Sequence, residues 1–183
     1  KTSKGRAIQN LINIEQDDKV KAFINTQDLK DEDYINSHYV IMVTKQGQVK
    51  KTSLEQYSRP RANGINAITV KDGDELLEAK LTNGESEILL ALKSGKSIRF
   101  EESKTRPMGR NASGVRGITL GGPNDEVIGM VSVNDASTDI LVVSENGYGK
   151  RSSLDDYRIT NRGGKGVKTI SITDKTGELV AIK

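Results

Sequence analysis

Continuous apolar runs open three stretches of the chain, at 39–44, 88–92 and 140–143. None of these runs alternates regularly with polar residues. A short run of this kind is typical of a β-strand that is covered on both faces. The pattern therefore predicts three buried strands at similar intervals along the chain.

A glycine follows each run, and a basic strand follows each glycine. We expect these glycines at tight hairpin turns, where a positive φ is common; they are Gly47, Gly95 and Gly147. The strands after them alternate more, as at 49–52 and 97–100, so they are expected to be half exposed. Each pair of strands is thus a predicted antiparallel hairpin.

The hairpins belong to a longer repeat. A second glycine precedes another apolar stretch in each unit, and Gly64, Gly114 and Gly166 lie 50 and 52 residues apart. Four strands are predicted in each unit; in the first they cover 39–44, 48–53, 65–70 and 75–81. A repeated four-stranded unit of this length is typical of a propeller blade, whereas a β-sandwich, the alternative, does not require such a period.

The whole chain, 1–183, is interpreted as one domain that contains three full units and one partial unit. The predicted boundaries are 1–38 for the partial unit, then 39–87, 88–139 and 140–183. Within the partial unit, 4–8 aligns with the second glycine segment, and 19–24 aligns with the last strand. Residues 28–34 form either one helical turn or a polar loop. The chain begins without Met and without a signal-peptide pattern, so we expect a fragment of a longer protein.

The amino-acid composition favours strands and excludes several kinds of metal, disulfide and membrane chemistry. Thirty residues are Ile or Val, which favour strands. The absence of cysteine excludes disulfides and thiolate metal sites, and a single histidine, His38, excludes multi-histidine metal sites. No apolar run approaches the length of a membrane span. No metal site, cofactor site or catalytic site is therefore expected in this chain, and no membrane partner.

Charge is segregated within each unit. The segments 45–61, 93–116 and 145–168 hold 18 of the 28 Lys and Arg residues but only six of the 25 Asp and Glu residues. Because the units repeat, equivalent segments are expected to face the same way and to form one continuous basic band. A solvated face that serves only solubility is the alternative. A basic band on a curved surface is typical of a nucleic-acid-binding protein.

The predicted DNA-binding residues are the basic residues of these segments. They are Lys50, Lys51, Arg59, Arg61, Lys96, Arg99, Lys104, Arg106, Arg110, Arg116, Lys150, Arg151, Arg158, Arg162, Lys165 and Lys168. Lys and Arg bind backbone phosphates without reading the bases. Few aromatic residues are present to stack on single strands, and no recognition helix is predicted, so double-stranded DNA is the expected partner.

Several strings resemble one family, the C-terminal domain of the bacterial DNA gyrase A protein, a type IIA topoisomerase. The resemblance covers essentially the whole chain. The strings that carry it are TSKGR at 2–6, GQVKKT at 47–52, KDGDEL at 71–76, MGRNASGVRGI at 108–118 and ENGYGKR at 145–151.

The resemblance implies an all-β fold, the β-pinwheel, a propeller-like disc whose blades exchange strands. It implies sequence-nonspecific binding, bending and wrapping of duplex DNA around the basic perimeter, in support of negative supercoiling. The implied partners are the rest of gyrase A and gyrase B, in an A2B2 heterotetramer that is an ATP-dependent isomerase of DNA topology. ATP and Mg²⁺ would be used by other domains, and the implied location is the cytoplasm, at the nucleoid.

One family motif is not intact. The gyrase-A box, Gln-Arg-Arg-Gly-Gly-x-Gly, belongs to the first blade of the family, and its nearest counterpart here is NRGGKG at 161–166. We therefore expect that this chain lacks the first blade.

Three alternatives stay open at this point. The chain resembles the equivalent domain of topoisomerase IV, which has fewer blades. A propeller that serves as a protein-interaction module would need apolar hot spots, and few are present. A propeller glycosidase would need converging carboxylates, but 101–102 and 155–156 are adjacent only in sequence, and neighbouring strand residues point to opposite faces.

Overall fold

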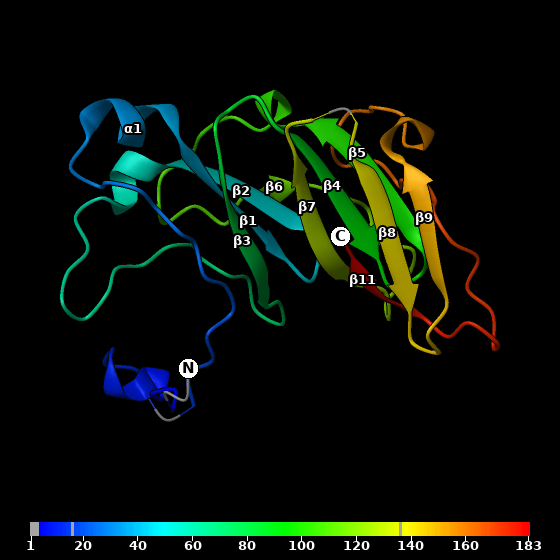
Figure 1. The fold of residues 1–183 in the computed structure, drawn as a ribbon, viewed down its shortest axis with the longest axis horizontal. Coiled ribbons are helices and arrows are strands. Elements are labelled where there is room, and N and C mark those ends of the chain that lie inside the picture. Colours follow the sequence, from blue (N-terminus) through cyan, green and yellow to red (C-terminus); the bar gives the residue numbers. More distant parts are fainter. Residues whose placement is uncertain (1–3, 16, 136) are drawn as a thin grey trace.

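Three antiparallel sheets stand side by side in the computed structural model, which describes residues 4–15, 17–135 and 137–183 (Figure 1). The strands are β1 (Tyr39–Thr44), β2 (Gln48–Ser53), β3 (Leu76–Thr82), β4 (Glu87–Leu92), β5 (Lys96–Glu101), β6 (Val115–Arg116), β7 (Val127–Val133), β8 (Asp139–Ser144), β9 (Gly149–Ser153), β10 (Val167–Lys168) and β11 (Leu179–Ile182). The helices are α1 (Glu32–Ser37) and the 3-10 helices η1 (Ile8–Asn10), η2 (Leu54–Tyr57), η3 (Glu102–Lys104) and η4 (Leu154–Asp156). None of the described helices is long and apolar enough to cross a membrane.

Each sheet is one blade that contains a predicted hairpin, which lies in the middle of the first two sheets and at one edge of the third. The strand orders are β3-β1-β2-β6, β10-β5-β4-β7 and β11-β8-β9. Register repeats from blade to blade, since Ile41 faces Lys51, Leu89 faces Arg99 and Leu141 faces Arg151. The hairpin glycines have positive φ, as the sequence predicts.

The blades exchange strands. β6 follows β5 along the chain but pairs with β2 of the preceding blade, with Val115 opposite Val49. β10 likewise pairs with β5, with Val167 opposite Ser97. Sequence units and blades are therefore out of step by one strand. The second and third repeats each supply three strands to their own blade and one short strand to the blade before it, as the family resemblance implies.

Two predicted strands are absent. Residues 65–70 form no strand, and neither do residues 19–24. The equivalents of 65–70, β6 and β10, each pair with the second strand of the preceding repeat, and no strand lies among the described residues before β1. Residues 65–70 therefore have no preceding strand among the described residues with which to form β-sheet hydrogen bonds. Residues 1–3 of the partial unit lie outside the described residues.

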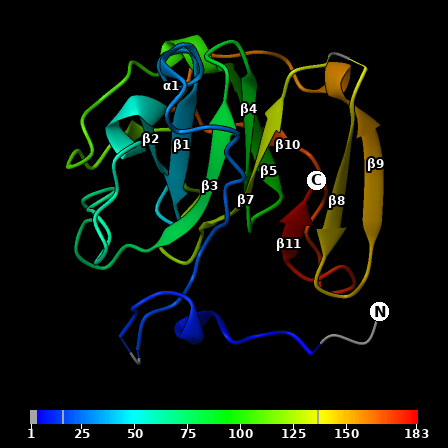
Figure 2. The ribbon, with the colours of Figure 1, turned by 60° about the vertical axis from the view of Figure 1, so that its left-hand side comes forward.

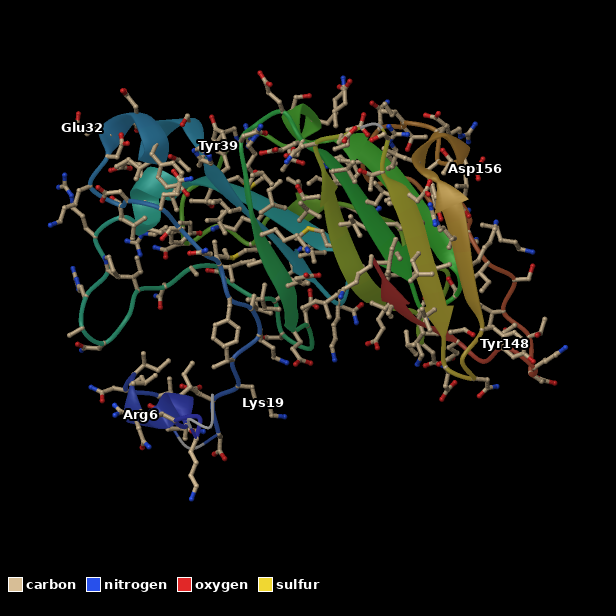
Figure 3. All side chains as sticks on the ribbon, in the orientation of Figure 1. Arg6, Lys19, Glu32, Tyr39, Tyr148 and Asp156 are labelled. Carbon is tan, nitrogen blue, oxygen red and sulfur yellow. The ribbon has the colours of Figure 1, made fainter. Side chains whose placement is uncertain are left out.

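The N-terminal segment runs away from the blades before α1 (Figures 1 and 2). Arg6 and Lys19 lie on this segment (Figure 3). α1 begins after Asp31, whose side chain accepts hydrogen bonds from the backbone N–H groups of Asp33 and Tyr34. Of the two alternatives for residues 28–34, the helical turn is partly right, because α1 begins four residues after the start of that range and ends three residues beyond it.

The cores lie between neighbouring blades. Ile88, Leu90 and Leu92 of β4 pack with the first blade, while Leu89 and Ala91 pack with the third. Successive strand residues point to opposite faces, so a blade between two others needs apolar residues at every position. This arrangement explains the continuous apolar runs.

The second strands differ from the prediction. The four central residues are buried in both β2 and β5, although the sequence predicts half-exposed strands. In β9, by contrast, only one of five residues is buried. β2 and β5 are covered by the following blade, whereas β9 is at the end of the row (Figure 1).

Candidate nucleic-acid interface

A loop leaves each second strand through a 3-10 helix and ends at a glycine; the second and third loops there reach the preceding blade. We call these segments the rim loops; they cover 58–66, 105–114 and 157–166. The serine before the helix accepts a hydrogen bond from the backbone at Ser53 and Ser153, which fixes how the chain enters η2 and η4. The first and third blades thus share this serine cap, whereas η3 of the second blade follows Glu101 and has no side-chain cap.

Thirteen of the sixteen predicted DNA-binding residues are exposed or half-buried. They are Arg59, Arg61, Lys96, Lys104, Arg106, Arg110, Arg116, Lys150, Arg151, Arg158, Arg162, Lys165 and Lys168. The other three, Lys50, Lys51 and Arg99, are at most 8% exposed. These three side chains therefore do not belong to the surface that the sequence predicts.

Lys50 lies inside the first blade. Its Nζ donates to the Tyr57 hydroxyl at 3.1 Å and to the Ala67 carbonyl at 2.6 Å. Burial, together with the nearby charge of Arg110, lowers the pKa of Lys50 to about 8. Burial also raises the pKa of Tyr57. The lysine is a packing residue with satisfied donors, which is why it cannot face DNA.

Lys51 joins the first two blades. Its Nζ lies 3.0 Å from the carboxylate of Glu102 in η3, and both side chains are almost fully buried. Glu102 also accepts from the Thr82 hydroxyl at 2.7 Å. The Lys51 ammonium lies 4.1 Å from the centre of the Tyr39 ring. Lys51 is thus part of a buried interblade network.

Arg99 joins the second and third blades from the equivalent position. Its Nε donates to Glu87 at 2.6 Å, and its Nη1 donates to the carbonyls of Leu154 and Tyr157, both at 2.9 Å. At each junction, one basic residue of the second strand reaches the next blade. Lys51 binds the carboxylate of Glu102, and Arg99 binds the carbonyls of Leu154 and Tyr157.

Arg151 occupies this same position in the third blade. It pairs with Asp139, and its side chain is 77% exposed. Lys150 beside it is also exposed, and its Nζ is 3.4 Å from the Thr169 carbonyl. Arg151 lies on the uncovered face of the last blade, and Lys150, the preceding residue of β9, points to the opposite face. Neither residue belongs to a rim loop.

Arginines link the second and third rim loops to the end of the preceding loop or to the short strand that follows it. Arg110 Nη1 donates to the Asn66 carbonyl at 3.1 Å, and Arg162 Nη1 donates to the Arg116 carbonyl at 3.0 Å. The two arginines occupy the same place in their repeats, four residues before the second glycine. The bonds hold neighbouring loops at a fixed spacing.

Two threonines add a parallel set of links, which the sequence reasoning missed. The Thr69 hydroxyl donates to the Asn111 carbonyl, and the Thr119 hydroxyl donates to the Gly163 carbonyl, both at 2.7 Å. Both threonines come five residues after the second glycine, so the repeat alignment contained the signal. The rim loops therefore lie in register along one edge.

Most of the rim charge is uncompensated. The ion pairs of the described residues include only one rim-side candidate, Lys104, whose Nζ is 3.7 Å from Glu101. Ten of the other predicted residues on or beside the rim loops have no carboxylate partner among the described residues: Arg59, Arg61, Lys96, Arg106, Arg110, Arg116, Arg158, Arg162, Lys165 and Lys168. Unpaired guanidinium and ammonium groups in such a row can bind a polyanion.

The acidic turns have local structural roles. The Asp74 carboxylate accepts from the backbone N–H of Gln46 at 2.9 Å, and Asp125 accepts from that of Ser94 at 3.0 Å. Each aspartate thereby closes the hairpin turn of its blade. Across residues 4–15, 17–135 and 137–183, no group of three or more His, Cys, Asp or Glu residues could hold a metal ion.

A row of strand-exchanging blades with one basic edge defines the class of fold, a β-pinwheel. A family model described as the DNA gyrase C-terminal domain, a β-propeller, matches residues 38–83, 87–134 and 138–183. The chain belongs to this family of DNA gyrase C-terminal domains.

Relatives and solved structures agree with this assignment. The DNA gyrase A protein of Staphylococcus aureus strain NCTC 8325 / PS 47 is 44% identical over 181 residues, which are 98% of this chain and 20% of that protein. The protein of strain MRSA252 is equally similar. The chain thus spans about a fifth of the curated relatives that it matches.

Two solved structures share the fold. The C-terminal domain of DNA topoisomerase IV superposes with a TM-score of 0.86 at 25% identity, over 98% of this chain and 54% of that chain. A DNA gyrase A C-terminal domain superposes with a TM-score of 0.84 at 24% identity, over 99% of this chain and 58% of that chain.

Proposed function

We propose that this chain binds duplex DNA along its rim loops and bends the DNA around the row of blades. The observation that carries the proposal is the row of unpaired basic side chains on loops that hydrogen bonds hold in register. Contacts to phosphates would be independent of sequence. Each neutralised phosphate would release counterions and so favour binding.

Bending requires enough phosphate contacts to offset its elastic cost. Turning about 20 to 30 base pairs by 40 to 90° costs on the order of 1–6 kcal/mol. The basic loops can contact successive phosphates only if the DNA bends along the row of blades. The additional phosphate contacts made by bent DNA would offset the elastic cost of bending. The mode is like that of proteins that wrap DNA through its backbone alone.

In a whole gyrase, the chain would guide DNA for negative supercoiling. We propose that it acts with the rest of gyrase A and with gyrase B in an A2B2 assembly at the bacterial nucleoid, in the cytoplasm. Strand cleavage and the use of ATP and Mg²⁺ would belong to other domains of that assembly. The 44% identity to gyrase A supports this assignment.

A topoisomerase IV origin is the second candidate. The fold similarity to a topoisomerase IV C-terminal domain favours it. An intact gyrase-A box in a further blade of the same protein would support gyrase, and its absence there would support topoisomerase IV.

Charge reversal on the rim tests the binding proposal. Arg106 and Arg158 occupy the same repeat position, and both are exposed. Arg106→Glu/Arg158→Glu should weaken duplex binding by about tenfold or more, measured by fluorescence anisotropy. Lys19→Glu/Lys30→Glu makes the same change in net charge away from the rim loops and should have a smaller effect. Equal losses in the two folded variants would contradict a rim-bound mode.

A further inference from the structure

The first two rim loops enclose a cavity of about 540 Å³. Its lining includes Arg59 and Arg61 from the first loop and Arg110 from the second. Four amide side chains complete its polar wall, and no carboxylate lines it. Sites for small ligands commonly have volumes of about 300–1,000 Å³. A concave site with three guanidinium groups and no acidic residue has the chemistry of a phosphate receptor.

Arg110 is positioned before any ligand arrives. Its backbone N–H donates to the Gln56 side chain at 3.1 Å, and its Nη1 donates to the Asn66 carbonyl at 3.1 Å. The link to Asn66 uses only one of the five N–H groups of the guanidinium. The cavity therefore has one fixed arginine wall, and binding would cost less ordering there.

The charge of the cavity acts on its surroundings. Arg110 contributes to lowering the pKa of the nearby Lys50, whose ammonium lies in the first blade. Arg59 and Arg61 form no ion pair with any described residue. An anion in the cavity would relieve this mutual repulsion of positive groups.

The second rim loop has its arginines at other positions than the first. In the repeat alignment, Gly109 and Asn111 replace Arg59 and Arg61. A cavity of about 550 Å³ on the second loop includes a single arginine, Arg106, in its lining. A further cavity beside the third loop is lined by Arg158, Lys165 and the buried Arg99. The cavity between the first two loops differs from both in having three arginine side chains.

We propose that the cavity lined by Arg59, Arg61 and Arg110 is a dedicated phosphate-binding site that anchors the nucleic acid on the rim. This inference rests on the proposed function, because the expected source of the phosphate is the backbone of duplex DNA. A free phosphate ion has the same chemistry and is the other source to be tested.

The test compares two matched variants of the same chain. Arg59→Gln/Arg61→Gln removes two cavity charges and leaves Arg110 and its link between loops intact. Lys19→Gln/Lys30→Gln removes two exposed charges that lie outside the rim loops and do not line this cavity. Duplex affinity is measured by anisotropy, and thermal unfolding verifies that both variants fold. The side-chain Nε–H signals of arginine are followed by NMR during titration with duplex and, separately, with inorganic phosphate.

We expect the cavity variant to lose about tenfold or more in duplex affinity and the control to lose about threefold or less. The Nε–H signals of Arg59, Arg61 and Arg110 should shift together when duplex is added. If inorganic phosphate shifts them while both variants bind duplex equally, the cavity is a phosphate site and its ligand is a free anion.

Equal losses in the two variants, with no concerted shift by either probe, would overturn the inference and leave the proposed function intact. If the unmodified chain binds no duplex, the proposed function fails, and the phosphate titration alone then decides whether the cavity binds an anion.

Discussion

Lys50 and Ile98 occupy the same place in successive repeats and show how one buried position accommodates two chemistries. Lys50 is accompanied by Tyr57, whose hydroxyl accepts from the ammonium and donates to the Ala67 carbonyl. Ile98 is accompanied by Thr105 at the position equivalent to Tyr57. The lysine is tolerated because its polar partners come with it, as a buried charge requires.

The lowered pKa of Lys50 predicts a pH dependence of stability. The folded chain releases the Lys50 proton near pH 8, whereas the unfolded chain keeps it up to the ordinary lysine pKa of 10.5. The unfolded state therefore binds more protons in this window, and the free energy of unfolding gains a positive slope with pH. Lys50→Met should remove this contribution in denaturant titrations between about pH 8 and pH 10.

Lys150→Met is the control, because Lys150 has the same repeat position but is exposed. It should leave the slope unchanged. A slope identical in Lys50→Met and the unmodified chain would show that Lys50 is not the titrating group.

The buried pair of Lys51 and Glu102 predicts a large mutational effect. Glu102→Gln leaves the Lys51 ammonium without a charged partner inside an interblade contact. Loss of one partner of a buried pair typically costs about 3–5 kcal/mol, which urea titration would reveal. Glu178→Gln, which breaks the exposed pair with Lys93, should change stability little. Comparable effects of the two changes would contradict the structural role of the buried pair.

At the scale of elements, strand exchange depends on the glycine just before each exchanged strand. Gly114 has a φ of +91°, and a Cβ there would lie 2.5 Å from the Val49 carbonyl oxygen. Gly166 has a φ of +72° and would meet the Ser97 carbonyl oxygen at 2.6 Å. The backbone of one repeat thus passes directly over the second strand of the preceding blade. Only glycine allows this approach.

Alanine substitutions distinguish the energetic cost of a backbone clash from the cost of a positive φ. Gly64 has a φ of +79°, but a Cβ there would meet nothing within 4 Å. Gly64→Ala should cost about 1–2 kcal/mol, the ordinary cost of a left-handed residue. Gly114→Ala adds a clash with backbone and should cost about 3 kcal/mol or more. Thermal unfolding measures both, and equal costs would contradict the close crossing.

The sequence predicts the hairpins well because their signals are local. Apolar runs such as 88–92 and turn glycines such as Gly95 depend on neighbours a few residues away. Residues 65–70 have the same local pattern as β6 but form no strand, since a strand also needs a partner. Partners come from other repeats, so pairing cannot be read from a single segment.

At the scale of the whole molecule, the sequence alone likewise does not reveal which basic residues of the candidate interface contact another repeat. Arg106 and Arg158 are exposed, as the charge pattern predicts, because the rim loops project from the edge of the blades. Lys51 and Arg99 belong to the same basic segments but are buried. Their burial depends on the next blade, which covers the second strand. Charge segregation therefore predicts which segments carry the exposed basic residues but does not separate contacts between blades from the free surface.

Because the blades stack in a row, the rim loops of neighbouring blades lie next to one another and form one continuous edge. The links from Arg110 to Asn66 and from Arg162 to Arg116 repeat at each step. Bound DNA should therefore follow the row rather than cross it. Fluorescence energy transfer between the two ends of a duplex of about 20 to 30 base pairs should increase on binding. Binding without such an increase would show that the DNA stays straight on the rim.

The salt dependence of duplex affinity tests the central claim most directly. Fluorescence anisotropy would give the affinity of the chain for a short duplex at several salt concentrations. The logarithm of the affinity should fall linearly with the logarithm of the salt concentration, by about 0.9 for each neutralised phosphate. A basic rim of three loops predicts a slope of about −3 or steeper. A slope near zero, or no binding at low salt, would contradict the claim that the rim binds the DNA backbone.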